Sequence, residues 1–372
     1  MNYLTDIVRR LEESKVYIYG AGLMGRALLK CIRETGIKCE VLGFLVGERG
    51  NNPYEIEGIP VNTVGESQEA KACTVLIALH EKHMNSAKDT LITKGFEDIY
   101  SISFDCDEWS DIRLCWLAQH KEVLPFDIDF ADTTERLPNK KSFVEHTSVY
   151  VARSIYDKTT NDIVQEIQPY EKYIQVGKAL TDERLCEITD DKGENISSKN
   201  RRYCELTALY WAWKNDDFSE YKGLSHYRRR FCQADDIGYM EDNGYDFALT
   251  VPITNFDTVR EQFGRDHSEV IWNTTQDVIG EICPDYLSDL DAIGVGIVYF
   301  GYNMFIARKE AFNDYCDWLF PILFEVEKRI GEIDDNYQNR YAGFVAERLL
   351  SVYLRHNRDK YKVILASKHF SI

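Results

Sequence analysis

Residues 15–25 read Lys-Val-Tyr-Ile-Tyr-Gly-Ala-Gly-Leu-Met-Gly, a β-rich run that passes into a G-x-G-x-x-G turn. In such a turn the first glycine permits a tight bend, the second lets a pyrophosphate approach the backbone, and the third lets strand and helix pack closely. Strands and amphipathic helices then alternate, which predicts a doubly wound parallel sheet. We expect Gly20, Gly22 and Gly25 to bind a cofactor, or else to serve only the packing of a Rossmann-like unit.

The turn lacks a well-placed acid for a nicotinamide cofactor. A dehydrogenase carries an Asp or Glu at the end of its second strand, where the carboxylate holds a ribose hydroxyl. Here the second expected strand begins near Glu40 and ends before Glu48, so one acid comes early and the other late. A redox enzyme that acts on nucleotide sugars is therefore only an alternative for this unit.

Composition restricts the partners and the compartment. The 372 residues include 44 Lys and Arg against 62 Asp and Glu, for a net charge of -18. Such a chain repels phosphate backbones, which argues against nucleic acid and against an anionic membrane surface unless a local basic patch overrides the total.

The ten cysteines form no CxxC pair and no metal-ligand spacing, as is typical of free thiols in a reducing cytoplasm. The longest uncharged apolar stretch, Gly294 to Ala307, is too short to span a bilayer. We expect a cytoplasmic protein, and work at the inner face of the cell membrane stays open.

Length and pattern divide the chain into three parts. At roughly 100–200 residues per domain, a chain of this length predicts two domains or three. We expect a Rossmann-like domain over residues 1–105, a helical linker over 106–146 and a second α/β domain over 147–372. In this second domain, apolar residues at helical spacing predict one helix over residues 200–215.

The second domain carries a cationic strand end. His226-Tyr227-Arg228-Arg229-Arg230 closes an expected strand that starts near Tyr221. Burying these positively charged groups is costly unless an anion pairs with them. A guanidinium group can donate two parallel hydrogen bonds to phosphate oxygens. We expect His226, Arg228 and Arg229 to bind a diphosphate; a solvated or salt-bridged strand end is the alternative.

Longer motifs in this half carry a family resemblance. They are Asn195 to Ser197, Lys199-Asn200, Tyr203 to Thr207, Tyr210 to Asn215, His226 to Phe231, Tyr302 to Ile306, Tyr315 to Phe320 and Gln338 to Leu349. Together they resemble a bacterial family of capsular and exopolysaccharide biosynthesis, domain of unknown function 4422. The resemblance implies a GT-A-like glycosyltransferase domain that uses a nucleotide-activated sugar.

The first part resembles the N-terminal Rossmann-like units of sugar acyltransferases. The matching residues are Tyr19 to Gly22, Gly43-Phe44 and Gly58-Ile59-Pro60-Val61. In those enzymes the unit can hold a nucleotide sugar. The resemblance leaves nucleotide binding and a purely structural role open for this chain.

The resemblance to the glycosyltransferase family also implies where substrates bind. The loop after the first strand of the second domain faces the nucleotide, and Arg153-Ser154 stands where family members commonly carry His-Lys. The other residues that we expect to bind substrate are Asn195, Lys199, Asn200, Tyr227, Asp285 and Asn303.

Metal and base follow from the chemistry of sugar transfer. Most GT-A enzymes hold a divalent metal with Asp-x-Asp at a strand end, but His226-Tyr227-Arg228 fills that slot here. We therefore assign no metal ligand and expect fixed cations to act instead. The alternative is a Mn²⁺ or Mg²⁺ site that joins His226 to a carboxylate or to His369. Inversion also needs a general base, and the resemblance implies Glu347, which stands in the slot where GT-A enzymes place an acid on a late helix. An ion pair of Glu347 with Arg348 or Arg340 is the alternative.

The expected function is transfer of a hexosyl residue, with galactose in pyranose or furanose form as one candidate, from a UDP-sugar to a capsular, exopolysaccharide or other cell-surface glycan. The partners are a nucleotide sugar donor and a glycan or lipid-linked glycan acceptor, with no nucleic acid. Peripheral membrane association and oligomer formation stay open. The alternatives are an NAD-dependent or nucleotide-sugar-modifying enzyme and a non-catalytic nucleotide-sugar-binding scaffold.

Overall fold

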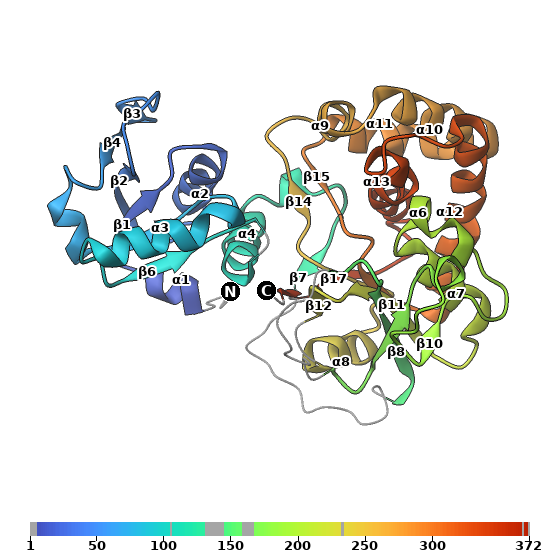
Figure 1. The fold of residues 1–372 in the computed structure, drawn as a ribbon. Helices are drawn as coiled ribbons and strands as arrows, with labels where there is room; N and C mark the ends of the chain where they lie inside the picture. The colour runs from blue at the N-terminus through green and yellow to red at the C-terminus, as the bar shows by residue number, and fades with distance from the viewer. Residues whose placement is uncertain are drawn as a thin grey trace. The chain divides into compact units, whose positions relative to one another are not determined.

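The chain separates into two compact units, Met1–Lys121 and Glu122–Ile372 (Figure 1). This computed structural model describes residues 6–104, 106–130, 145–157, 167–231, 234–366 and 368–370. The boundary falls inside the segment expected as a linker. Helix α4 (Asp107–Gln119) belongs to the first unit, and strand β7 (Asp129–Phe130) pairs within the second.

The first unit is built around a six-stranded sheet in the order β3-β4-β2-β1-β5-β6. All of its neighbours pair in parallel except β3 and β4. The strands are β1 (Lys15–Tyr19), β2 (Glu40–Val46), β3 (Glu55–Ile56), β4 (Ile59–Thr63), β5 (Thr74–Ile77) and β6 (Ile99–Ser101), and the other helices are α1 (Asp6–Leu11), α2 (Leu23–Glu34) and α3 (Glu81–Thr93). Buried side chains of β1, β2 and β5 pack with α3 in one apolar cluster, as expected for an α/β layer.

The glycine turn between β1 and α2 is fixed by its own packing. Gly20 has φ +119°, which side chains other than glycine rarely adopt. A Cβ on Gly25 would lie 1.9 Å from the carbonyl oxygen of Gly20, whereas a Cβ on Gly22 would meet nothing within 4 Å. Two of the three glycines are therefore required by the turn itself, with or without a ligand.

The second unit contains a ten-stranded mixed sheet whose main path runs β10-β9-β8-β11-β16-β13-β17-β7. The strands β8, β9, β10 and β11 are parallel, and β16 is antiparallel to both of its neighbours. The strands are β8 (Thr147–Arg153), β9 (Glu171–Gln175), β10 (Ile188–Thr189), β11 (Tyr221–His226), β12 (Arg229–Phe231), β13 (Phe247–Leu249), β16 (Phe305–Arg308), β17 (Val363–Leu365) and β18 (Lys368–Phe370), beside a separate pair, β14 (Ile253–Thr254) and β15 (Val298–Tyr299). The expected α/β class is confirmed for the chain.

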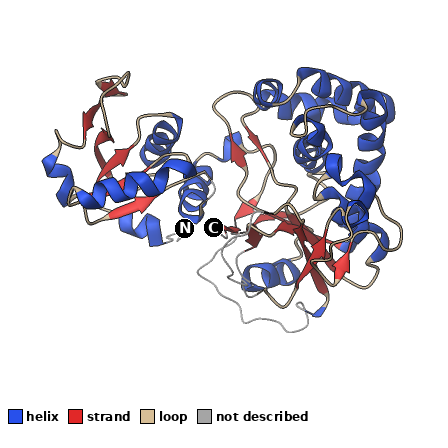
Figure 2. Ribbon diagram, viewed as in Figure 1, coloured by secondary structure: helices blue, strands red, loops and turns tan. Residues whose placement is uncertain are grey.

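Helices of very different length accompany this sheet (Figure 2). They are α6 (Asn200–Tyr203), α7 (Leu206–Asn215), α8 (Ala234–Asn243), α9 (Val259–Asp266), α10 (Glu269–Ile282), α11 (Leu287–Val295), α12 (Lys309–Ile330) and α13 (Tyr341–His356). The helix α12 packs against α10, α13 and α7, and it also contacts β11 and β16. Within the described ranges, no helix combines the length and the apolar character that crossing a bilayer requires.

Two expected elements are interrupted in the structure. The helix expected over residues 200–215 breaks at Cys204, whose φ of +49° separates α6 from α7. The strand expected to run through Arg230 stops at His226, and β12 returns beside it. Apolar spacing does not detect either break, because buried residues continue on both sides.

We predict that Gly25→Ala destabilises the first unit by about 1–3 kcal/mol, because the new methyl group collides with backbone. Gly22→Ala should cost less than about 1 kcal/mol, since its Cβ enters open space. Calorimetric unfolding of the full chain measures both. If both variants lost the same free energy of unfolding, this account of the turn would be contradicted.

Candidate functional site

The cationic strand end is a tight hairpin. The strand β11 ends at His226, which pairs with Arg229 across the antiparallel β11–β12 contact. Tyr227 and Arg228 therefore form the turn. Because successive side chains of a strand point to opposite faces, Arg229 and Arg230 reach different surroundings.

Arg230 is held by an internal carboxylate. Its Nε donates to Oε1 of Glu171 at 3.0 Å and its Nη2 donates to Oε2 of the same residue. Both side chains are almost fully buried. The alternative of a salt-bridged strand end therefore holds for Arg230, and this bidentate pair does not include Arg228 or Arg229.

Arg229 and His226 both contact the segment that precedes β16. The guanidinium carbon of Arg229 lies 4.4 Å from the ring centroid of Tyr302, within the range of a cation–π interaction. Nε2 of His226 donates to the carbonyl oxygen of Tyr302 at 2.6 Å. Burial lowers the pKa of His226, so its imidazole is neutral at neutral pH.

Tyr302 and Asn303 are both in the left-handed region, with φ +68° and +52°. Such conformations are unfavourable for residues with a side chain and persist where surrounding contacts hold them. The N–H of Tyr302 donates to Oε1 of Glu347 at 2.9 Å. Nδ2 of Asn303 donates to Oε1 of Glu205 at 2.7 Å and to the carbonyl oxygen of Gly343 at 3.2 Å.

Asn303 keeps one polar atom without a partner. Its side chain is 2% exposed, and its Oδ1 accepts no hydrogen bond from the described residues. A buried acceptor in this state is costly, and such atoms are rare in folded proteins. Its placement beside Glu205 and Glu347 makes this corner a candidate ligand-contact point.

Glu347 is engaged at both carboxylate oxygens. Its Oε1 accepts the hydrogen bond from the N–H of Tyr302, and its Oε2 accepts one from Nη1 of Arg348 at 2.7 Å. Arg348 is itself fixed by Oε1 of Gln262 at 2.8 Å and by the hydroxyl of Tyr299 at 3.1 Å. Burial raises the pKa of Glu347, although the charge of Arg348 opposes the shift. The Glu347–Arg348 ion pair that sequence analysis weighed against a base role is therefore present. A carboxylate whose pKa is raised is a stronger base than an ordinary glutamate.

Sequence analysis missed Glu205 and Arg340 as members of this cluster. The break after α6 places Glu205 against Asn303, where its charge also raises the pKa of Glu347. Nε of Arg340 lies 3.1 Å from Sγ of Cys204. Burial raises the pKa of the Cys204 thiol to about 12, so the thiol is not a nucleophile at neutral pH. Both residues lie inside the family motifs, but helical spacing alone does not bring them to the site.

A second group of expected residues gathers beside the hairpin. Arg153 ends β8 at the level of His226, since Ala152 pairs with His226 in register. Its guanidinium carbon lies 5.5 Å from the ring centroid of Tyr173 and 5.8 Å from that of Tyr227. Arg153 also pairs with Asp157, whose carboxylate accepts the N–H of Ser154 at 2.9 Å.

Of four other expected substrate ligands, three are bound by protein groups and one is exposed. Asn195 accepts the N–H of Ser197 at 3.2 Å, and Asn200 donates to the carbonyl oxygen of Cys204 at 2.7 Å. Lys199 donates to Glu327 at 2.7 Å. Asp285 is exposed in the short turn Pro284–Tyr286. The structure thus brings His226, Arg229, Asn303 and Glu347 together, and gives these four residues other surroundings.

The described residues do not include a set of side chains that could hold a metal ion by themselves. Among the described residues, no three His, Cys, Asp or Glu side chains are arranged to hold an ion. The Nε2 proton of His226 is directed to Tyr302, and the side chain of His369 lies outside the described part.

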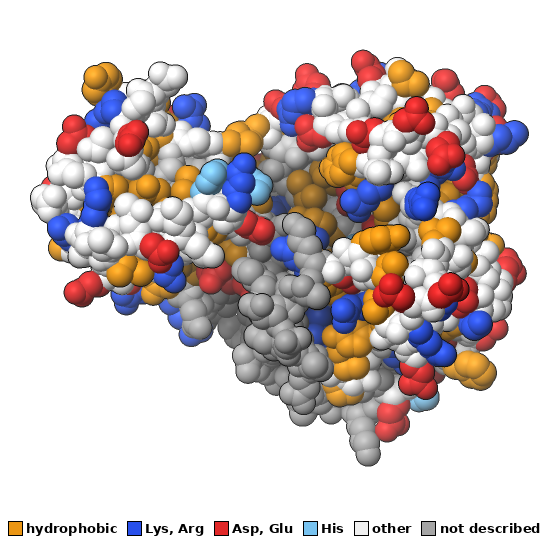
Figure 3. Space-filling model, in the orientation of Figure 1, with side chains coloured by type: hydrophobic (Ala, Val, Ile, Leu, Met, Phe, Trp, Pro, Cys, Tyr) orange, Lys and Arg blue, Asp and Glu red, His pale blue; other side chains and the backbone are white. Residues whose placement is uncertain are grey.

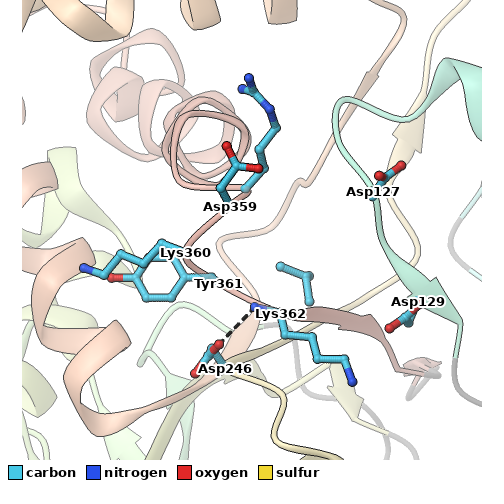
Figure 4. A pocket seen from close by; sticks show the side chains of 9 residues that line it. Asp127, Asp129, Asp246, Asp359, Lys360, Tyr361 and Lys362 are labelled. Atoms are coloured by element: carbon cyan, nitrogen blue, oxygen red, sulfur yellow. Dashed lines mark hydrogen bonds between the residues drawn. The ribbon is translucent and has the colours of Figure 1, made fainter.

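A cavity of about 350 Å³ lies at the opposite edge of the sheet, before β13 and β17 (Figure 4). Carboxylates and cations alternate on its walls, and the backbone N–H of Lys362 donates to Asp246 at 2.9 Å. The other labelled side chains include Asp127, Asp129, Asp359 and Lys360. Because four carboxylates outnumber the three cations that line it, this cavity offers no anion-binding counterpart to the hairpin.

Solved structures give one informative similarity. The apo structure of WbbM, a bifunctional glycosyltransferase, is 25% identical with a TM-score of 0.52, and the match covers 60% of this chain. It covers 45% of WbbM, so the chain spans less than half of that protein. Core-mannan synthase A (CmsA/Ktr4) from Aspergillus fumigatus, solved in a Mn/GDP form, is 14% identical with a TM-score of 0.30 over 65% of this chain and 79% of that one, too distant to support an argument. No curated relative matches.

The family assignment rests on the unit that holds the cluster. The profile described as Domain of unknown function (DUF4422) matches residues 155–358. That range contains β11, β12, the left-handed pair at 302–303 and Glu347. Since the match spans more than half of the sequence, this chain belongs to the DUF4422 family.

Proposed function

We propose that the second unit is a glycosyltransferase that transfers a hexosyl residue from a UDP-sugar to a capsular, exopolysaccharide or other cell-surface glycan. The observation that carries this proposal is the convergence of a cationic hairpin and a buried carboxylate of raised pKa at one sheet edge. The similarity to WbbM over 60% of the chain supports the same class of reaction.

The donor lies at the carboxyl ends of β8 and β11, since open α/β sheets bind ligands at such edges. Arg153 and Ser154, with the rings of Tyr173 and Tyr227, face the nucleoside, because flat cationic and aromatic groups suit a base. Arg228 and Arg229 bind the diphosphate in place of a metal.

The reaction is a displacement at the anomeric carbon. The acceptor hydroxyl oxygen forms a bond to C1 of the sugar, and the bond between C1 and the diphosphate oxygen breaks. The electron pair leaves with UDP, where the guanidinium groups of Arg228 and Arg229 stabilise the added charge. The acceptor proton passes to the carboxylate of Glu347. His226 is a positioning residue, since its Nε2 proton holds the carbonyl of Tyr302.

The proposal gives the glycine turn of the first unit no part in the reaction. Packing accounts for Gly20 and Gly25, and Glu48 is exposed just after β2. A cofactor-dependent enzyme centred on the first unit is therefore less well supported than transfer in the second. The proposed place of action is the cytoplasm, with a glycan or a lipid-linked glycan as acceptor.

We predict that the purified chain releases UDP from at least one UDP-hexose, and that Arg229→Ala lowers kcat/KM by about 10²–10³-fold. Arg358→Ala is the matched control, since Arg358 lies at the opposite sheet edge and is half exposed. An equal effect of the two variants would remove Arg229 from the diphosphate site. Binding of UDP-sugars without any turnover would favour the scaffold alternative.

We predict that the acidic limb of the pH–rate profile lies above the ordinary glutamate pKa of 4.5. Because burial raises the pKa of Glu347, the base form disappears as pH falls through that higher value. Glu347→Gln should reduce kcat by about 10²–10⁴-fold.

Glu205→Gln serves as the matched comparison for Glu347. Removing its charge should move the acidic limb to lower pH with a smaller loss of rate, because Glu205 raises the pKa of Glu347. If Glu205→Gln abolished turnover and Glu347→Gln did not, the base would be Glu205.

We predict that turnover persists in excess EDTA, because the described donor set does not fit a metal and guanidinium groups serve the diphosphate. Initial rates of UDP release with EDTA, and with added Mn²⁺ or Mg²⁺, measure this. Loss of activity in EDTA with recovery on adding either ion would reject the metal-free mechanism.

A further inference from the structure

A second cavity lies between α6 and α12, beside the candidate site. It measures about 550 Å³ and is lined by Lys199, Arg202, Phe324, Glu327 and Lys328. We call it the α6–α12 cavity. Lys and Arg side chains gather on the surface over α6 in the space-filling view (Figure 3). In a chain with a net charge of -18, such a concentration of cations at a cavity calls for a specific explanation.

The cations of this cavity are held in place by one carboxylate. Glu327 accepts hydrogen bonds from Nζ of Lys199 at 2.7 Å, from Nη1 of Arg202 at 2.6 Å and from the hydroxyl of Tyr203 at 2.9 Å. Burial alone would raise the pKa of Glu327, but the hydrogen bonds from Lys199 and Tyr203 lower it, so the carboxylate stays ionised.

The cavity keeps an excess of positive charge after this pairing. Lys199 and Arg202 carry two charges against the single charge of Glu327. Lys328 adds a third cation, which pairs with Glu325 on the same helix at 3.0 Å. Even with Lys328 counted as neutralised, one positive charge remains unbalanced, and an anionic ligand would balance it.

Aromatic rings accompany these charges. Nζ of Lys199 lies 5.8 Å from the ring centroid of Phe324 and 5.9 Å from that of Tyr203. Phe324 is half-buried and lines the cavity. An apolar ring face beside fixed cations suits a sugar ring that carries a phosphate or carboxylate.

The short helix α6 connects this cavity to the candidate site. Lys199 and Arg202 lie at its start and within it, and Glu205 follows its end and contacts Asn303. On the other side, Nη2 of Arg202 lies 3.4 Å from Oδ1 of Asn339, the neighbour of Arg340. Asn339 lies in the turn just before α13, the helix that carries Glu347, so the cavity and the candidate site are built on the same two segments of the chain.

We propose that the α6–α12 cavity binds an anionic substituent, a phosphate or a carboxylate, of a sugar in the glycan acceptor. The inference rests on the proposed function and adds the chemical class of the acceptor. Lys199 and Arg202 bind the anion, Phe324 packs against the sugar ring, and Glu327 keeps the two cations in place. Lys199, which sequence analysis assigned to substrate, then serves the acceptor rather than the donor.

Binding of small probes to the full chain tests this subsite. The probes are glucose 1-phosphate, glucuronate and glucose, compared at equal ionic strength by titration calorimetry. We expect glucose 1-phosphate or glucuronate to bind at least about tenfold more tightly than glucose. A preference for the first identifies a phosphate-bearing acceptor, and a preference for the second identifies a uronic acid. Equal affinity for all three probes overturns the proposal.

A double variant, Lys199→Gln with Lys328→Gln, locates the site of binding. Both lysines are largely exposed, and Arg202 and Tyr203 still bind Glu327 in the variant. We expect at least a tenfold loss of anion affinity. Lys192→Gln is the control, since the side chain of Lys192 is as exposed as that of Lys328 and pairs with Asp191 outside the cavity. Unchanged affinity in the double variant, or an equal loss in the control, overturns the proposal.

Donor hydrolysis separates this inference from the proposed function. UDP release without acceptor depends on the hairpin, so Arg229→Ala should lower it while glucose 1-phosphate or glucuronate still binds that variant as tightly as the wild-type chain. A wild-type chain that binds anionic sugars in the cavity but never releases UDP would refute the transferase proposal and leave the anion site standing. A selective loss of UDP release in the double variant would assign the cavity to the donor and overturn the acceptor subsite.

Discussion

The candidate site depends on the left-handed backbone at Tyr302 and Asn303. This backbone conformation costs about 1–3 kcal/mol for each residue, and it persists only where contacts with the surroundings offset that cost. Three elements far apart in the sequence do so: His226 at the end of β11 binds the carbonyl of Tyr302, Glu347 of α13 accepts its N–H, and Glu205 after α6 binds the amide of Asn303. The contacts that hold the turn are also the groups to which we assign chemistry, so folding of this corner and assembly of the site are one event.

Electrostatics in this unit are local rather than global. The chain carries a net charge of -18, which would repel an anionic donor at long range. The cations of the hairpin counteract this repulsion only at short range. Because side chains alternate between the two faces of a strand, Arg229 and Arg230 of β12 have different partners. Arg230 satisfies the buried carboxylate of Glu171, so the pair stabilises the sheet, whereas Arg229 lies on Tyr302. Within this charge run Arg230 therefore serves the fold, and Arg229 is the residue that we propose for the donor.

The sequence predicts local elements well and long-range pairings poorly. The strand Lys15–Tyr19 matches its expected bounds, because strand propensity and the glycine turn are local signals. The cationic run indicates His226, the need for a general base indicates Glu347, and the family resemblance indicates Asn303. Their contacts with one another are long-range and come only from the structure. The break at Cys204 is a single backbone angle that periodicity does not register, so Glu205 was missed. The partner of Arg230 is 59 residues away, and the Tyr227-Arg228 turn lacks the Gly, Asn or Pro that marks most hairpins.

The central claim is that the guanidinium groups of the β11–β12 hairpin meet the diphosphate of a nucleotide sugar beside Tyr302 and Glu347. A crystal structure of the full chain with bound UDP measures this most directly. The account predicts diphosphate oxygens within hydrogen-bond distance of Arg228 or Arg229, with the uracil near Tyr173 and Tyr227. A nucleotide bound only at the glycine turn of the first unit, with the hairpin empty, would contradict it.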